Sequence, residues 1–290
     1  VARRSWNAFQ LDLGARVDKV TSSPDGAASR SFTPLSLSLA GGWKLTERLR
    51  LTANFDHAER APVEEELFAD GPHIATLAYE IGDPNLGKEA ANQLELGLQY
   101  QSDRVDTKVS AYYNRFSDFI YLLDTGSSLY REDDDDFLPI RQWSQANASF
   151  RGLECEATFH LADTEQGDWD LRVFGDTVRA TLQSGGNVPR IPPSRLGAQL
   201  RWKHDGWRAA LGATRNNRQD KLAQNETPTA GYTLVDAHAT RHFDAGTMSW
   251  ELFADATNLT NQVGRVHTSF LKDAVILPGR AFSFGVRVFF

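Results

Sequence analysis

Apolar and polar residues alternate along most of the chain. Leu35, Leu37 and Leu39 are separated by serines, and apolar side chains fill every second position from Phe282 to Phe290. A period of two gives a β-strand one apolar face. The pattern predicts about twelve strands and no helix of comparable length, with the strands near residues 6–19, 32–45, 49–56, 92–101, 105–121, 139–161, 168–183, 194–203, 206–216, 230–243, 247–258 and 279–290.

The connections between these strands are alternately short and long. A meander with all its short turns at one end and all its long loops at the other is typical of an outer-membrane barrel. The short connections are 45–48, 101–104, 203–206 and 243–246, with 162–168 slightly longer. The long polar connections are 20–31, 57–91, 122–138, 184–193, 217–229 and 261–278.

Aromatic side chains gather beside the short turns, as expected for a ring at a membrane interface. A soluble sandwich has no reason to place its tryptophans at one end only. The aromatic residues concerned are Trp43, Tyr100, Trp169, Trp202, Trp207, Phe243 and Trp250. The polar face of the strands would then line a lumen, with Glu154, Glu156, Arg172, Arg179, Gln199 and Arg201 among its residues.

Composition narrows the function classes. The 290 residues are 24% charged and 41% hydrophobic, and the net charge is −7 without a Lys- or Arg-rich stretch, so we expect no nucleic-acid partner. Cys155 is the single cysteine and forms no internal disulfide. The longest apolar run, 119–123, is far shorter than the roughly 20 residues of a membrane-spanning helix. Twelve strands could close alone into a narrow channel or belong to a 22-stranded barrel, and composition leaves both open.

Several segments carry a family resemblance. Residues 59–67, 71–76 and 79–98 resemble the central barrel segment of TonB-dependent outer-membrane receptors, and 258–261 and 277–290 resemble the end of that barrel. The resemblance implies an all-β fold, an antiparallel meander of about twelve strands forming the C-terminal part of a 22-stranded transmembrane outer-membrane β-barrel. Residues 1–290 would be that barrel portion, without the plug domain and the TonB box. The resemblance also implies that the protein is not an enzyme.

The same resemblance implies partners and cargo. The TonB complex of the inner membrane, outer-membrane lipid and the assembly machinery that reads a last strand ending in Phe290 are the expected partners, and no prosthetic group is expected. Segments 71–82 and 265–272 look most like zinc-uptake receptors. Related haem receptors place a histidine between an Arg-Ala-Pro box and an Asn-Pro-Asn-Leu box. Here 60–62 and 83–86 flank His73, with Asp83 replacing the asparagine. Zinc is therefore the first expectation for an active transporter, haem or a ferric siderophore the alternative, and a passive twelve-stranded channel a further one.

The long loops hold the candidate metal ligands. Zinc binds to histidine nitrogen and carboxylate oxygen, so a loop rich in both can capture it. Each such residue could equally be an ordinary solvated loop residue, and the acidic run a solvated tip. If His73 is a ligand, we expect a carboxylate or His267 close enough to share an ion with it. The candidates are His73 with Asp70, Glu64, Glu65, Glu66 and Glu80, then His267, then Asp133, Asp134, Asp135 and Asp136.

Overall fold

The main sheet is an antiparallel meander. The structure is a computed structural model that describes residues 1–24, 26, 28–132 and 135–290. Each main strand pairs with the next along the chain, and all twelve predicted strands are present. The strands, in order across the sheet, are β1 (Ala2–Trp6), β2 (Phe9–Val17), β5 (Leu35–Lys44), β6 (Leu49–Arg60), β9 (Glu89–Gln101), β10 (Val105–Arg131), β11 (Asp136–Thr164), β12 (Gly167–Leu182), β13 (Arg195–His204), β14 (Trp207–Asn216), β15 (Tyr232–Ala245), β16 (Met248–Thr257) and β17 (Ala281–Phe289).

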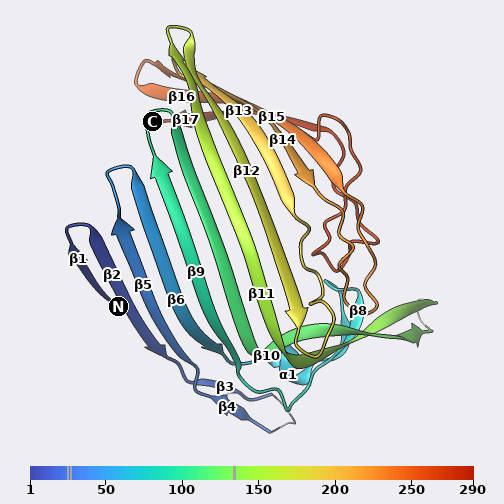
Figure 1. Cartoon of the computed structure of the whole chain (residues 1–290). Helices are drawn as coiled ribbons and strands as arrows, with labels where there is room; N and C mark the ends of the chain where they lie inside the picture. Colours follow the sequence, from blue (N-terminus) through green and yellow to red (C-terminus); the bar gives the residue numbers. More distant parts are fainter. Residues whose placement is uncertain (25, 27, 133–134) are drawn as a thin grey trace.

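The sheet curves but stays open, as Figure 1 shows. β1 and β17 form its two edges, and among the described residues neither pairs with the other. The arrangement is a partial barrel, not a sealed narrow one. The first predicted strand differs in detail: the chain reverses at Asn7, where φ is 33°, so Ala2–Trp6 runs back along β2. Asparagine tolerates this positive φ better than most residues.

Short turns lie at one end of the sheet and long connections at the other (Figure 1). The long connections contain small elements of their own. They are β3 (Val20–Ser22), β4 (Arg30–Phe32), α1 (Glu64–Phe68), β7 (Asp70–His73) and β8 (Ala78–Ile81). β8 also joins the main sheet by pairing in parallel with residues 140–142 of β11. No helix in the described part of the chain is both long and apolar enough to cross a bilayer.

The expected loop at 122–138 is largely a strand pair. β10 continues to Arg131 and β11 starts at Asp136, so a β-hairpin arm extends beyond the rest of the sheet. Its register shifts between Phe116 and Phe119 and again between Asp124 and Ser128. Such bulges bend a strand pair and increase its twist. They accompany the turn of the arm away from the sheet, visible at the lower right of Figure 1.

Apolar side chains cover one face of the sheet and aromatic pairs mark the turn end. Leu37 remains 46% exposed, as expected where lipid would cover the strand. The Phe9 and Trp43 rings stack with centroids 5.2 Å apart, and Phe243 stacks on Trp250 at 6.5 Å. On the polar face, charges pair across strands, as in the Arg172–Glu156 bridge of 2.5 Å.

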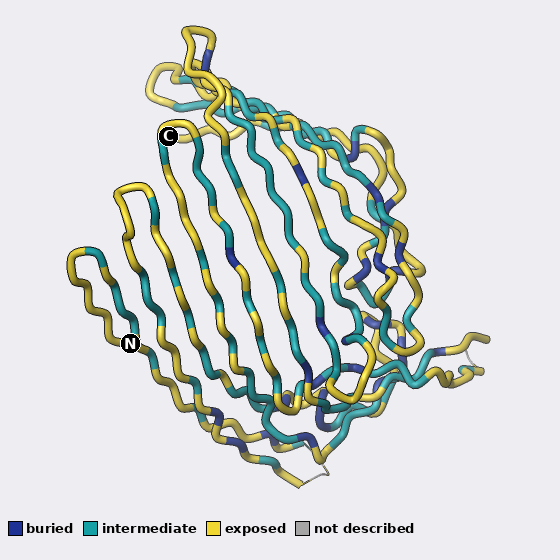
Figure 2. Tube along the Cα trace, viewed as in Figure 1, coloured by how far each residue is buried: buried dark blue, intermediate teal, exposed yellow. Residues whose placement is uncertain are grey.

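The packed core lies at the loop end, where Figure 2 shows most of the buried residues. One cluster joins Phe32, Leu67, Leu86 and Ile120, which come from three loop segments and β10. A second cluster contains Ala148, Ala180 and Val188, packed by the Phe116, Phe119 and Phe150 rings. The loops are therefore fixed on the sheet by apolar contacts, and they can hold side chains in defined positions.

Candidate functional site

Glu66 is committed to local structure. Its carboxylate accepts hydrogen bonds from Arg60 Nη1 and from the backbone N–H of Val63, both at 2.8 Å, and its side chain is 7% exposed. Arg60 also lies 3.3 Å from Glu89 at the start of β9. These contacts attach the short helix α1 to the ends of β6 and β9. Glu64 and Glu65, in the first turn of α1, are exposed.

His73 ends β7 and its side chain is 49% exposed. Nδ1 lies 3.6 Å from Oε1 of Glu80, whose side chain is only 5% exposed. The Thr76 hydroxyl donates to the same Glu80 oxygen at 2.6 Å. Asp70, also expected near His73, instead accepts a hydrogen bond of 2.8 Å from the Tyr79 hydroxyl. The structure thus brings together one expected pair, His73 and Glu80.

His267 belongs to a different cluster. It is buried, with Nδ1 2.7 Å from the Thr229 hydroxyl and Nε2 3.2 Å from Oε1 of Glu226. Glu226 also accepts from the backbone N–H of Ala223 at 2.9 Å and of Arg190 at 2.8 Å. Although burial acts to raise it, the pKa of Glu226 lies below its ordinary value, because His267 and these N–H groups favour the carboxylate.

The described residues of the acidic run, Glu132, Asp135 and Asp136, lie at the tip of the hairpin arm. Asp133 and Asp134 fall outside the described residues. Asp135 accepts a hydrogen bond of 2.8 Å from the Tyr130 hydroxyl, and Asp136 lies 4.0 Å from Arg131. Within residues 1–24, 26, 28–132 and 135–290, no group of three or more His, Cys, Asp or Glu side chains is arranged to hold a metal ion.

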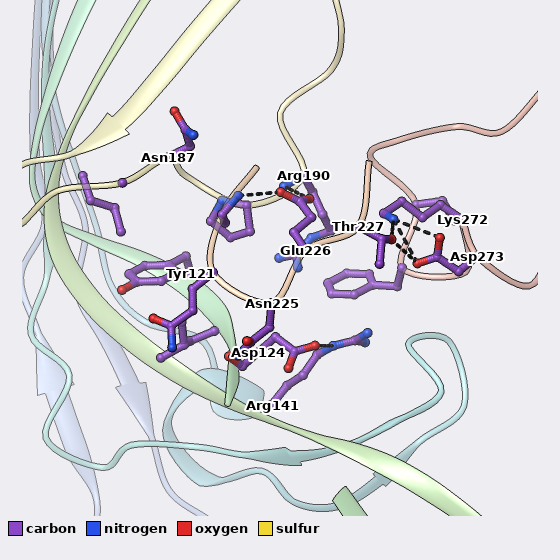
Figure 3. Close-up of a pocket in the computed structure, with 18 of the residues that line it drawn as sticks. Tyr121, Asp124, Arg141, Asn187, Arg190, Asn225, Glu226, Thr227, Lys272 and Asp273 are labelled. Atoms are coloured by element: carbon purple, nitrogen blue, oxygen red, sulfur yellow. Dashed lines mark hydrogen bonds and ion pairs between the residues drawn. The ribbon is translucent and has the colours of Figure 1, made fainter. Parts of the chain in front are cut away.

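A cavity of about 430 Å³ lies among the long connections. It is lined by β10, β11 and the three connections that follow β12, β14 and β16 (Figure 3). Two guanidinium groups contact one ring there: the Cζ atoms of Arg190 and Arg141 lie 3.9 and 4.9 Å from the centroid of Phe270. Burial, and then the charge of Arg141, lower the pKa of Arg190 to about 10.

Two arginines of the cavity wall are hydrogen-bonded to residues of the two histidine clusters. Arg141 Nη1 donates to the carbonyl oxygen of Thr76 at 2.9 Å, in the turn that follows His73. On the other side, the backbone of Arg190 binds Glu226, which contacts His267. Neither arginine was predicted from the sequence, because nothing in the local sequence distinguishes them from other arginines of the chain.

Family comparison agrees with this architecture. Residues 2–259 match the family described as TonB dependent receptor-like, beta-barrel. The chain belongs to this family, whose proteins are outer-membrane β-barrel transporters and not enzymes.

Individual relatives carry haem in their names. The chain is similar to hemoglobin-haptoglobin utilization protein B of Neisseria meningitidis serogroup C, 27% identical over 180 residues, which are 53% of this chain and 22% of that protein. It is also similar to heme/hemopexin utilization protein C of Haemophilus influenzae strain 86-028NP, 28% identical over 225 residues, or 68% of this chain and 30% of that protein. The chain thus spans less than a third of the length of these curated relatives.

Solved structures share the fold. The copper transporter OprC superposes with a TM-score of 0.78 at 22% identity, over 97% of this chain and 45% of that one. The FrpB iron transporter from Neisseria meningitidis (F3-3 variant) gives 0.70 at 15% identity, over 99% and 44%. Such distant likeness establishes the barrel and leaves cargo open. The zinc expectation therefore stays a prediction.

Proposed function

We propose that this chain is part of an active transporter that takes up a metal complex through the outer membrane with energy delivered by TonB. Family membership supports the class, and the separation of short turns from long loops supports an outward-facing binding end. No covalent step is needed. The TonB complex, the surrounding lipid and the machinery that reads the strand ending in Phe290 are the proposed partners.

We propose haem as the cargo, and the observation that carries this is the exposed imidazole of His73 with the carboxylate of Glu80 beside it. Haem iron needs one axial imidazole, whereas zinc usually takes four ligands. His73 stands between the 60–62 and 83–86 boxes, and the two curated relatives described above are named for haemoglobin and haem. This order reverses the preference drawn from sequence.

Zinc remains the second candidate because His73 and Glu80 already form a nitrogen–oxygen pair at 3.6 Å. Bound zinc would complete its shell with groups from elsewhere, such as the exposed Glu64 and Glu65 or water. Asp70 could join only by giving up its bond to Tyr79. At the arm tip, Asp135 and Asp136, together with the neighbouring acidic positions, remain candidates for weak capture of cations.

The test compares two histidines of similar exposure. His73 is 49% exposed at the loop end, and His242 is 52% exposed near the short turns. The complete gene product, purified in detergent, is titrated with haem by visible absorbance and with zinc by calorimetry. We expect His73→Ala to lower haem affinity at least tenfold and His242→Ala to leave it unchanged.

The possible results separate the candidates. Loss of zinc binding with haem binding intact would make zinc the cargo. If neither ligand responds to His73→Ala, this histidine is an ordinary loop residue. Energy coupling is tested separately, since uptake by cells that lack TonB should fall to background while binding at the cell surface persists.

A further inference from the structure

The guanidinium group of Arg190, in the loop cavity, has no hydrogen-bond acceptor within the described part of the chain. Lys272 contacts Asp273 at 2.9 Å, and Arg141 lies 3.9 Å from Asp124. Among the described residues, the Arg190 guanidinium forms no hydrogen bond or ion pair; only its backbone N–H is bonded, to Glu226. The charged side chains that line the cavity are Arg141, Arg190, Lys272, Asp124, Glu226 and Asp273.

The position of Arg190 is fixed and electrostatically unfavourable. Its guanidinium packs on Phe270 at 3.9 Å, and Arg141 packs on the same ring at 4.9 Å. Burial and the charge of Arg141 disfavour the cationic form of Arg190, and the charges of Glu226, Glu80 and Asp124 offset this effect only in part. A partly buried charge beside a like charge costs free energy unless an anion compensates it. The neighbouring carboxylate, Glu226, is already occupied by His267 and two backbone N–H groups.

We propose that Arg190, assisted by Arg141, binds a carboxylate group of the transported cargo inside this cavity. The guanidinium group presents a planar fork of N–H donors that matches a carboxylate, and Phe270 holds that fork in place. The volume of about 430 Å³ admits an acidic side arm of a larger ligand. This inference rests on the proposed function and specifies the cargo class as a metal complex that bears carboxylates.

The position of the cavity relative to His73 supports the same ligand class. Arg141, which lines the cavity, donates to the carbonyl oxygen of Thr76, three residues after His73, so one side chain links the anion site to the turn that follows the metal-binding candidate. Haem carries an iron and two propionates, and ferric citrate carries iron and free carboxylates. Either would offer a metal to His73 and an acid to Arg190. A phosphate, from lipid or solution, would offer only the second.

The experiment uses haem and its dimethyl ester, in which both propionates are methylated and carry no charge. Both are titrated against the complete gene product, its Arg190→Gln and Arg190→Lys variants, and a control, Lys221→Gln. Lys221 is exposed in the same connection as Glu226 and does not line the cavity. Loss of a charge-assisted contact predicts a roughly tenfold to hundredfold weaker haem affinity for Arg190→Gln. The ester should bind to the unmodified protein more weakly than haem does. Arg190→Gln should not weaken ester binding any further. Arg190→Lys should give an intermediate haem affinity, and Lys221→Gln should leave haem affinity unchanged.

Three outcomes would overturn the anion site. Equal losses for haem and ester in Arg190→Gln would make Arg190 a structural residue, and no loss for either would leave it without a role in binding. Competition by inorganic phosphate at least as strong as by acetate would assign the site to phosphate. If the unmodified protein binds neither haem nor its ester, the haem proposal fails, and ferric citrate then decides with the same variants. Absence of ferric citrate binding, or binding unaffected by Arg190→Gln, refutes the carboxylate site too.

Discussion

Arg60 and Glu66 form an ion pair of 2.8 Å that fixes the beginning of α1. The pair lies where β6 ends, and the Glu66 carboxylate also accepts the backbone N–H of Val63. Sequence alone placed Glu66 among the metal ligands together with Glu64 and Glu65. The structure separates them, since Glu66 is buried and bonded while its two neighbours face solvent.

This difference predicts unequal effects of two similar substitutions. Glu66→Ala leaves Arg60 without one partner and the N-terminus of α1 without its acceptor, which should cost about 1–3 kcal/mol of local stability. Amide hydrogen exchange across residues 61–69 should accelerate accordingly. Glu64→Ala is the control and should leave exchange unchanged. Equal exchange rates in both variants would show that Glu66 does not stabilise α1.

The orientation of the barrel is open to chemical labelling. With Cys155 replaced by serine, single cysteines at Asp220 and Asp103 report on the two ends of the sheet, because both positions are exposed. On intact cells, a membrane-impermeant maleimide should label Asp220→Cys and leave Asp103→Cys unmodified. Both should react after lysis. Labelling of Asp103→Cys on intact cells would invert the topology.

Acid should loosen the connection that carries Glu226. The pKa of this carboxyl is lower in the folded protein than in the unfolded chain, where it is about 4.3. Its stabilising contribution is therefore complete at neutral pH and is lost as pH falls from about 4.3 through the folded-state pKa. Hydrogen exchange of 217–231, measured from pH 7 to pH 3 and corrected for intrinsic rates, should show this loss. In Glu226→Gln the same region should exchange faster at pH 7 and vary less with pH.

Two glycines in short turns should differ in their tolerance of alanine. At Gly167, φ is 118°, and an added Cβ would lie 2.5 Å from Trp202 Nε1 and 2.6 Å from the Lys203 carbonyl oxygen. At Gly246, φ is 66° and nothing in the described part of the chain lies within 4 Å of such a Cβ. Gly167→Ala should cost roughly 2–5 kcal/mol and Gly246→Ala about 1 kcal/mol. Urea unfolding of the detergent-solubilised protein measures both, and similar midpoints would contradict the crowding at Gly167.

Strand prediction succeeded where lipid and lumen impose opposite requirements on alternate residues. Beyond the membrane this constraint ends. The arm formed by the end of β10 and the start of β11 has no strict alternation of apolar and polar residues, so the sequence did not predict these strand extensions. The Ala2–Trp6 hairpin was missed because its turn, at Asn7 and Ala8, contains neither glycine nor proline. In both segments, strand pairing depends on contacts with adjacent strands, which the local sequence pattern does not reveal.

Site residues that are close together in the sequence could be associated before the structure was known, whereas residues far apart could not. His73 and Glu80 are seven positions apart in one loop, so composition alone could associate them, and the structure places them together. Arg141, Arg190 and Phe270 come from three separate connections or strands and meet only in the folded protein. His267, one of several alternatives for a ligand shared with His73, is buried against Thr229 and Glu226. Its sequence neighbourhood contained no sign of this partnership.

The length of the hairpin arm affects which part of the protein a large molecule outside the cell would contact first. From Phe119 to Arg131 a strand rising about 3.3 Å per residue covers roughly 40 Å. Leu129, Tyr130 and Phe137 are exposed near its tip. Such a projection would be the first part of the protein that an antibody or a bacteriophage encounters.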